Sequence, residues 1–414
     1  MSNSSFQRPD AAAVSSTVSQ AVTGHLLLWR LPRAAEVRWR IIVGSFLLDM
    51  AVGVQFVALP LFAIELGATS LFLGVMGSVM SFSYVSSAVL FGGLSDRMRR
   101  TTLLKAAPLV YALAVAAVPV WHSLWPLLAW SVVMPISNGM FWPAWQGWIA
   151  DVSVPEKRRA HLSLFCVAWS AGIAAGLLVG GAVGQLGLHW AFSLSALLGV
   201  LTTWVVWPER GGLAPANEHE LKSLLPPVMP DRRWMLLAWL GNSGTMFSVM
   251  TVRNLFPKLA VTLGMPAWEL GALVMLVNAM QTTVFYLLGR WPGWQGNFRL
   301  VVLTQLGLAL GMATLGVVEH PLLIAVPMVL AGTAAGLNFT LSMSYSVAGE
   351  QARGLKAGLH EAVAALGGMT GPVLSGLVVG YVGDLHAAYP FCGAVVLLAL
   401  LAQQIVWRQH RKSE

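Results

Sequence analysis

Charged residues are scarce in this sequence. Only 10% of its 414 residues are Asp, Glu, Lys or Arg, whereas 57% are hydrophobic. Soluble domains usually carry about a quarter charged residues, so this composition excludes an ordinary water-soluble protein. The formal net charge is +8. In so hydrophobic a chain, we attribute the basic excess to membrane topology and anionic lipid head groups, and we expect no nucleic-acid partner.

Cysteine is equally scarce, and recognisable motifs of enzymes are missing. Cys166 and Cys392 both fall inside apolar segments, so we expect neither a structural disulfide nor a metal site. The sequence shows no phosphate-binding Walker loop, no spaced His/Cys cluster and no nucleophile motif. This pattern argues against an enzyme, a resident cofactor and a nucleotide-driven pump. Residues 1–37 lack the basic start and apolar core of a cleavable signal peptide.

What the sequence has in abundance is long hydrophobic runs. A helix of roughly twenty apolar residues spans the hydrocarbon core of a bilayer. Twelve such runs are present, at 41–64, 70–91, 101–120, 124–149, 161–186, 190–207, 235–260, 268–289, 298–318, 322–346, 357–382 and 388–407. The sequence therefore predicts an all-α integral membrane protein with twelve transmembrane helices.

The basic residues predict the orientation of these helices. If both termini are cytoplasmic, 23 of the 25 Lys and Arg residues lie on the cytoplasmic side, and only Arg253 and Lys258 do not. Cytoplasmic loops are enriched in Lys and Arg, so this arrangement is the one expected. The short loops indicate a prokaryotic plasma (inner) membrane.

The chain repeats itself. LPLFAIELGATSLFLG at 59–74 aligns with FPKLAVTLGMPAWELG at an offset of 197, and residues 156–181 align with 351–376 at an offset of 195. Six helices separate the copies, which predicts a parallel repeat about an axis along the membrane normal. The predicted parts are a flexible cytoplasmic tail (1–37), an N-terminal half (38–207), a cytoplasmic linker (208–233), a C-terminal half (234–408) and a short tail (409–414).

Three motifs carry a family resemblance. GGLSDRMRR, between the second and third spans, matches the pattern G-x-x-x-D-R-x-G-R-[RK] at Gly92, Asp96, Arg97 and Arg100. PAWQGWIADVSVPEKRR, at the end of the fourth span, supplies an acidic and a basic position at Asp151 and Arg158. The eleventh span contains Gly358, Gly367, Gly371, Pro372 and Gly376. With these motifs the chain resembles the major facilitator superfamily.

The resemblance implies a secondary transporter built from two pseudo-symmetric six-helix bundles. It places Asp96 near the helix that begins around Lys356, and Arg97 or Arg100 near Asp151. These charges would form a cytoplasmic gate, although the basic ones can also simply fix the topology. The gate residues are Gly92, Asp96, Arg97, Arg100, Asp151, Arg158 and Arg353.

The glycine-rich runs of the fifth and eleventh spans are expected to allow close helix packing. The residues are Gly172, Gly176, Gly180, Gly181, Gly367, Gly371, Pro372 and Gly376. The eleventh-span run resembles a glycine-proline motif that antiporters of the family carry on the fifth helix. The fifth helix of this chain has Leu177 where the family has proline.

Three charged residues inside the spans are candidates for proton coupling or substrate binding: Asp49, Arg253 and Glu361. Asp49 follows Arg40 by nine residues and thus lies about 14 Å deep. A carboxyl group there usually faces a water-filled cavity, where it can exchange a proton. The alternative is a neutral Asp that hydrogen-bonds a neighbouring helix. Its repeat equivalent is Met246, so the feature is asymmetric.

Arg253 lies seven residues after Met246, on the same helix face. It can bind an anionic group or pair with a carboxylate, or it can snorkel to the outer interface beside Lys258. Glu361, five residues after Lys356, is either a coupling or gating residue or an interfacial carboxylate at a helix start.

Polar and aromatic stripes on the fourth, eighth and tenth spans predict a central cavity. Its expected lining is Asn138, Trp142, Trp145, Asn278, Gln281, Asn338, Ser342 and Tyr345. Small polar residues also hold membrane helices together, and Trp often marks the interfaces, so the same pattern is compatible with simple packing.

Two classes of function fit the sequence. The first is a secondary transporter that works by alternating access, with proton-coupled export of an amphipathic or cationic compound as the favoured form. Uptake or uniport of a sugar-like or anionic solute is the alternative in this class. The second is a non-transporting receptor or assembly factor of the same fold. The expected partners are a small-molecule substrate, protons and membrane lipid, and the protein is expected to be monomeric.

Overall fold

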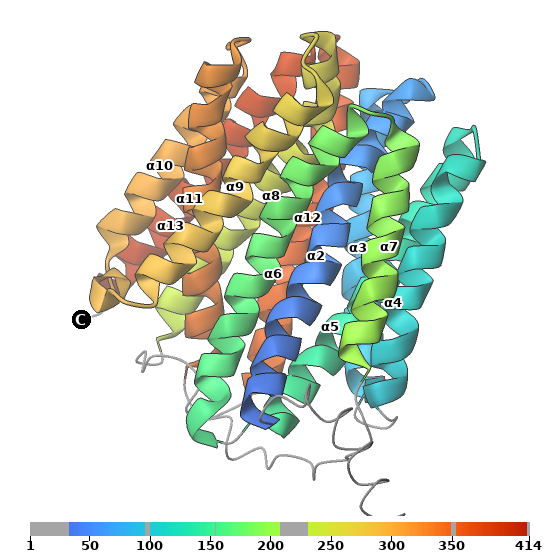
Figure 1. Ribbon diagram of the computed structural model, residues 1–414. Coiled ribbons are helices and arrows are strands. Elements are labelled where there is room, and N and C mark those ends of the chain that lie inside the picture. Colours follow the sequence, from blue (N-terminus) through green and yellow to red (C-terminus); the bar gives the residue numbers. More distant parts are fainter. Residues whose placement is uncertain (1–32, 96–99, 154, 208–230, 349–352, 412–414) are drawn as a thin grey trace, which may run out of the picture. The chain divides into compact units, whose positions relative to one another are not determined.

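The computed structural model describes residues 33–95, 100–153, 155–207, 231–348 and 353–411 (Figure 1). Asp96 and Arg97 of the predicted gate lie outside these ranges. The chain divides into two units, Met1–Arg40 and Ile41–Glu414. The helix packing described below is that of the second unit.

Twelve described helices are long and apolar enough to cross a membrane, which confirms the twelve predicted spans. They are α2 (Arg33–Glu65), α3 (Ser70–Ser95), α4 (Arg100–Ala117), α5 (Leu124–Val152), α6 (Pro155–Gly184), α7 (Leu188–Val206), α8 (Arg232–Thr262), α9 (Ala267–Leu288), α10 (Phe298–Leu315), α11 (Pro321–Val347), α12 (Arg353–Val382) and α13 (Ala388–Arg411). Three short 3₁₀ turns, η1 (Val118–Val120), η3 (Pro292–Trp294) and η4 (Leu385–Ala387), lie beside them. The described part of the chain is all-helical.

Several helices begin before the apolar run that revealed them. α2 begins at Arg33, α6 at Pro155 and α12 at Arg353, whereas the apolar runs were predicted to begin at 41, 161 and 357. The added turns are rich in Arg, Lys and Glu. Backbone hydrogen bonding continues past the end of an apolar stretch wherever the chain leaves the lipid as a helix, so hydropathy alone underestimates these lengths.

Helices from the two predicted halves pack against each other in two matching pairs. α3 packs on α12, and α6 packs on α9. The Ser78 hydroxyl donates to the carbonyl of Met369, and Ser81 Oγ donates to the carbonyl of Gly368 at 3.2 Å. In the other pair, Ser170 and Thr282 share a hydrogen bond. Each pair joins one helix of the first predicted half to one of the second.

The conspicuous glycines lie at these helix contacts and at those within each predicted half. Gly181 of α6 faces the backbone of α9 at Gly271, and Gly376 of α12 faces α3 at Ser70. Gly172, Gly176 and Gly180 pack on α2, while Gly367 and Gly371 pack on α8. The Pro372 carbonyl lies against Gly74 of α3. A side chain at any of these glycines would collide with the backbone of the neighbouring helix.

Two contacts connect the predicted halves at the helix ends that we expect to face outward. Lys258 Nζ donates to the carbonyl oxygen of Ala68, between α2 and α3, at 2.5 Å. The backbone N–H of Ala267, at the start of α9, donates to Gln185 Oε1 at 3.0 Å. The structure thus describes a state in which the predicted outer ends of the two halves are in contact.

The interiors of the two predicted halves differ at equivalent positions. Gly44 of α2 is covered by Trp145 and Val206, and Trp145 Nε1 donates to Ser45 Oγ at 3.0 Å. Gly241, 197 residues later, is covered instead by three amides, which we name the amide cluster: Gln305 of α10, Asn338 of α11 and Gln403 of α13. All three are fully buried. Val206 and Gln403 thus lie against equivalent glycines, so an apolar contact in one half corresponds to a polar one in the other.

Candidate functional site

The candidate site is built around Arg253, in the part of α8 that we expect to lie towards the outer leaflet. Its guanidinium donates to Asn278 Oδ1 of α9 at 3.2 Å and approaches the Met250 sulfur at 4.0 Å. It also lies over the Phe56 ring of α2, 4.3 Å from the ring centre. All three partners are neutral. Among the residues that the structure describes, no carboxylate oxygen lies within ion-pair distance of this guanidinium.

A small cavity adjoins Arg253 and is formed by three helices. Its lining is Gln55, Phe56, Leu59 and Pro60 of α2, Met76 and Met80 of α3, and Arg253 and Asn254 of α8. Its volume is about 10 Å³, which is about the room that one water molecule needs. Gln55 is 1% exposed, and its Nε2 donor has no hydrogen-bond partner in the described ranges. The cavity therefore has two hydrogen-bond donors in its wall, one of them cationic.

The predicted repeat symmetry locates this cavity near the expected two-fold axis. Phe56 and Arg253 are separated by 197 residues, so they occupy equivalent positions in the two repeats. Two equivalent residues of a two-fold repeat meet only near its axis, and these two are in contact. Arg253 consequently points between α2 and α8 and does not snorkel to the outer interface, which was one of the two sequence-based expectations.

Asp49 lies in the middle of α2, 4% exposed. Its Oδ2 atom has no hydrogen-bond partner among the described residues. Seven residues separate Asp49 from Phe56, so both lie on one face of α2, about 10 Å apart along the axis. No direct ion pair joins the Asp49 carboxyl to the Arg253 guanidinium in the part of the chain that the structure describes.

Glu361 lies near the start of α12 and is exposed. Because α12 begins at Arg353, Glu361 is a little more than two turns inside the helix, slightly deeper than the sequence indicated. Its neighbour His360 is fully buried and shares a 2.6 Å hydrogen bond with Ser342 of α11. Ser342, an expected cavity residue, is thus occupied by a helix-to-helix contact.

Three more of the expected cavity residues are buried inside the predicted halves. Trp145 is stacked on Trp148 with ring centres 4.6 Å apart. Asn338 Nδ2 donates to Thr245 Oγ1 at 3.1 Å and to the Ala334 carbonyl at 3.0 Å. Both side chains make contacts within one predicted half, although Asn338 Oδ1 has no hydrogen-bond partner among the described residues. Their assignment to a cargo pathway stays a prediction.

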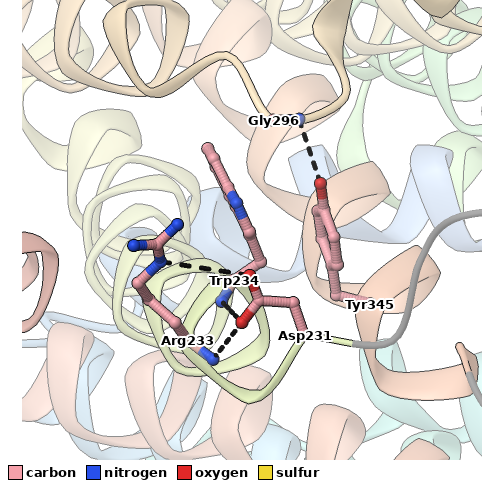
Figure 2. A network of polar contacts seen from close by, with 5 residues as sticks. All are labelled: Asp231, Arg233, Trp234, Gly296 and Tyr345. Atoms are coloured by element: carbon pink, nitrogen blue, oxygen red, sulfur yellow. Dashed lines mark hydrogen bonds and ion pairs between the residues drawn. The ribbon is translucent and has the colours of Figure 1, made fainter. Parts of the chain in front are cut away.

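Tyr345 is the third, and Figure 2 shows its surroundings. Its hydroxyl accepts a hydrogen bond from the Gly296 N–H at 3.0 Å, and its ring stacks on Trp234 at 5.5 Å. Asp231 caps α8 beside it by accepting from the N–H groups of Arg233 at 2.7 Å and Trp234 at 3.4 Å. Tyr345 therefore joins the end of α11 to the start of α8 and to the loop after η3.

The other four expected cavity residues also lie at helix contacts. Asn278 accepts from Arg253, as described above, and Gln281 is buried one turn later on α9. Trp142 is partly exposed and meets the Phe141 ring edge-to-face at 4.9 Å. Asn138 Oδ1 is buried without a hydrogen-bond partner among the described residues. The assignment of these four residues to a cargo pathway stays a prediction.

The predicted cytoplasmic gate is described only in part. Arg100 of α4 forms an ion pair with Asp151 of α5, the pairing expected for one of the two candidate arginines. Gly92 lies on α3, with Pro143 of α5 its nearest neighbour. Arg158 and Arg353 lie in the first turns of α6 and α12, but their side chains are outside the described set, as are Asp96 and Arg97 altogether.

The comparisons with known proteins agree with this fold. A sequence model described as Major Facilitator Superfamily matches residues 41–349. The chain belongs to the major facilitator superfamily. It is an integral membrane protein, and because the family consists of transporters, it is a transporter and not an enzyme.

Individual members of the superfamily resemble the chain only distantly. Quinolone resistance protein NorA of Staphylococcus aureus is 22% identical over 383 residues, which cover 88% of this chain and 95% of NorA. The class C tetracycline resistance protein of Escherichia coli is 30% identical over 125 residues, 30% of this chain and 31% of that protein. A solved bacterial homologue of the human lysosomal transporter Spinster has a TM-score of 0.72 at 14% identity, covering 92% of this chain and 98% of that one.

Sequence reasoning missed Gln55 and Phe56, although both belong to the cavity. A single glutamine and a phenylalanine inside an apolar helix look like ordinary packing residues. The available signal was the repeat: Phe56 aligns with Arg253, the most unusual charge of the C-terminal half. Comparing the two repeats position by position would have pointed to it.

Proposed function

We propose that this protein exports an amphipathic or cationic small molecule in exchange for protons, with Asp49 as the coupling residue. The observation that carries the proposal is the buried Asp49 carboxyl, in the middle of α2, with an oxygen to which no described residue donates a hydrogen bond. A permanent charge is costly at this depth. A carboxyl that alternates between a neutral and a charged form as the path opens to water would couple protons to transport.

Two further observations support this proposal. The curated relatives reported above are both resistance proteins by name, one to quinolones and one to tetracycline. In addition, Asp49 has no counterpart in the other repeat, where Met246 occupies its place. An asymmetric carboxyl is not needed by the two-fold fold itself, so a specific role is the simpler explanation. The plasma (inner) membrane is the proposed location.

The test uses purified protein in liposomes that hold a pH-sensitive dye. A panel of amphipathic cations, sugars and small anions is added outside the liposomes. The variants are Asp49→Asn and, as a matched control, Glu319→Gln, which removes a carboxylate from the exposed loop between α10 and α11. We expect one compound class to evoke proton movement with the wild type and the control. We expect Asp49→Asn to lose at least about 90% of it.

Other outcomes are equally informative. Cargo movement that is equal in wild type and Asp49→Asn, without proton movement, would contradict coupling through this residue. Uptake of an anionic solute is the second candidate function, and the neutral surroundings of Arg253 favour it. Symport would be recognised in the same liposomes because the anion and the proton would move in the same direction.

A further inference from the structure

We infer that the cavity between Arg253 and Gln55 is a subsite for the carboxylate group of the transported compound, an inference that deepens the proposed function and rests on it. The transported compound is then an amphipathic molecule that carries a carboxylate, either a zwitterion or an organic acid. The inference rests on the hydrogen-bond donors and apolar side chains that line the cavity, and not on the size of the cavity.

The first argument is that no carboxylate of the described residues pairs directly with Arg253. Its partners are an amide oxygen, a thioether and an aromatic ring. A guanidinium that leaves water is normally paired with a carboxylate or phosphate, because the fork of its N–H groups matches such a group in two places. Here that partner is missing among the residues that the structure describes, while the cation faces a cavity between the predicted halves.

The second argument is an unpartnered donor among the other lining residues. Gln55 Nε2 is buried and has no acceptor within the described ranges. Buried amide donors are almost always hydrogen-bonded. An anion in the cavity would accept from Gln55 on one side and from Arg253 on the other, so both unsatisfied groups would be satisfied together.

The third argument is the shape of the surroundings. Leu59, Pro60, Met76 and Met80 form the rest of the wall. An apolar wall beside two donors suits an anionic group attached to a hydrocarbon or aromatic body better than a free, fully hydrated ion. Asp49 lies about 10 Å further along α2 on the face of Phe56 and can receive a cationic group of the same compound.

The test is equilibrium binding in detergent, without a membrane or a proton gradient. The probes are a fluorescent quinolone with a free carboxylate and its methyl ester, which differ only in the anionic group. With the wild type we expect the acid to bind more tightly than the ester. With Arg253→Gln we expect acid binding to weaken about 10- to 100-fold, the loss of one charge-assisted hydrogen-bonded contact, while ester binding changes little.

Three further variants separate charge from folding. Arg253→Lys keeps the cation and is expected to retain most of the preference for the acid. Gln55→Leu removes the second donor and is expected to weaken acid binding alone. Arg290→Gln is the matched control, because Arg290 also lies over a ring, that of Tyr286 at 3.6 Å, but is exposed and outside the cavity; we expect no change.

Equal binding of acid and ester to the wild type, or the same loss of both with Arg253→Gln, would overturn the inference. Competition by sodium chloride that removes acid binding, together with chloride-dependent thermal stabilisation in the absence of quinolone, would assign the cavity to a small inorganic anion and would also overturn it. Binding is measured without a gradient. The binding result therefore tests this inference even if proton-coupled export in liposomes is not observed.

Discussion

Gln305 poses a clear question at the scale of a single residue. It is fully buried between α8, α10, α11 and α13, and neither its Nε2 nor its Oε1 has a hydrogen-bond partner among the described residues. Its neighbours in the amide cluster are partly satisfied: Gln403 Nε2 donates to the Leu237 carbonyl at 2.7 Å, and Asn338 makes the two bonds described above. Gln305 is thus the member of the amide cluster whose buried polar atoms have the fewest hydrogen bonds among the described residues.

We predict that Gln305→Met increases stability. The thioether has nearly the same shape and no strong polar group, so the substitution removes two unpartnered buried atoms and breaks no described hydrogen bond. The expected gain is about 1–3 kcal/mol in the free energy of unfolding. Thermal unfolding of the purified protein measures it. Asn338→Leu is the control, since it removes two hydrogen bonds and is expected to destabilise. A destabilised Gln305→Met would mean that ordered water satisfies the amide in the cluster.

Sequence alone predicted part of the candidate site at this scale. Asp49 and Arg253 were found because a charge inside an apolar run is rare and costly. Trp145, Asn338 and Tyr345 make contacts within one predicted half, and their assignment to the cavity stays a prediction, since the spacing of residues on a helix defines a common face but not the direction in which that face points. The direction depends on the rotation of each helix within its bundle, which packing with several other helices determines.

At the scale of the helices, glycines divide into those that join the predicted halves and those that pack within one half. Gly74 of α3 lies against the Pro372 carbonyl of α12, across the two halves. Gly371 of α12 lies against the Phe247 carbonyl of α8, within one half. If the halves rock against each other during transport, the first contact must open in each cycle and the second must not.

We therefore predict different consequences for the same substitution. Gly74→Ala and Gly371→Ala should each lower stability by about 1–3 kcal/mol, because an added Cβ meets neighbouring backbone. Only Gly74→Ala should also change the transport rate per folded molecule, since it disturbs the closed outer contact. Gly380→Ala is the control, because nothing lies within 4 Å of the added atom. Measurements are thermal unfolding and cargo flux in liposomes; equal flux effects for Gly74→Ala and Gly371→Ala would argue against rocking at this contact.

The positions of the helices along the chain were largely predictable, and their ends and mutual contacts were not. Twelve apolar runs of sufficient length predict twelve transmembrane helices. In lipid, the backbone N–H and C=O groups of such a run must hydrogen-bond to each other, and a helix achieves this within one segment. The extra turns at the start of α2, α6 and α12 were missed, as these segments are polar. The pairing of α3 with α12 and of α6 with α9 depends on side-chain contacts between helices distant in sequence.

At the scale of the whole molecule, the repeat combines a symmetric framework with asymmetric contents. The helix pairs α3–α12 and α6–α9 match, and Phe56 meets its own equivalent, Arg253. The contents differ at equivalent positions: Asp49 against Met246, and Phe56 against Arg253. Symmetry suits the rocking of two similar halves, whereas binding a compound with no symmetry requires different side chains in each half. The candidate site lies where these differences meet.

The last prediction concerns orientation, which the distribution of basic residues indicates. Arg290 and Arg299 flank η3 between α9 and α10, whereas the loop between α10 and α11 carries Glu319 and His320. The positive-inside rule places the first loop in the cytoplasm and the second outside. The test introduces Arg299→Cys or Glu319→Cys, both at exposed positions, into a Cys166→Ser background, because Cys166 is exposed and Cys392 is buried.

A membrane-impermeant maleimide should label Glu319→Cys in intact cells and leave Arg299→Cys unmodified until the membrane is permeabilised. Inside-out vesicles should reverse the pattern. The reverse pattern in intact cells would place Arg253 and its cavity in the cytoplasmic half of the membrane, so that the contact between Lys258 and Ala68 would close the inner mouth. The cavity would then open to the cytoplasm when the contact between Lys258 and Ala68 is released.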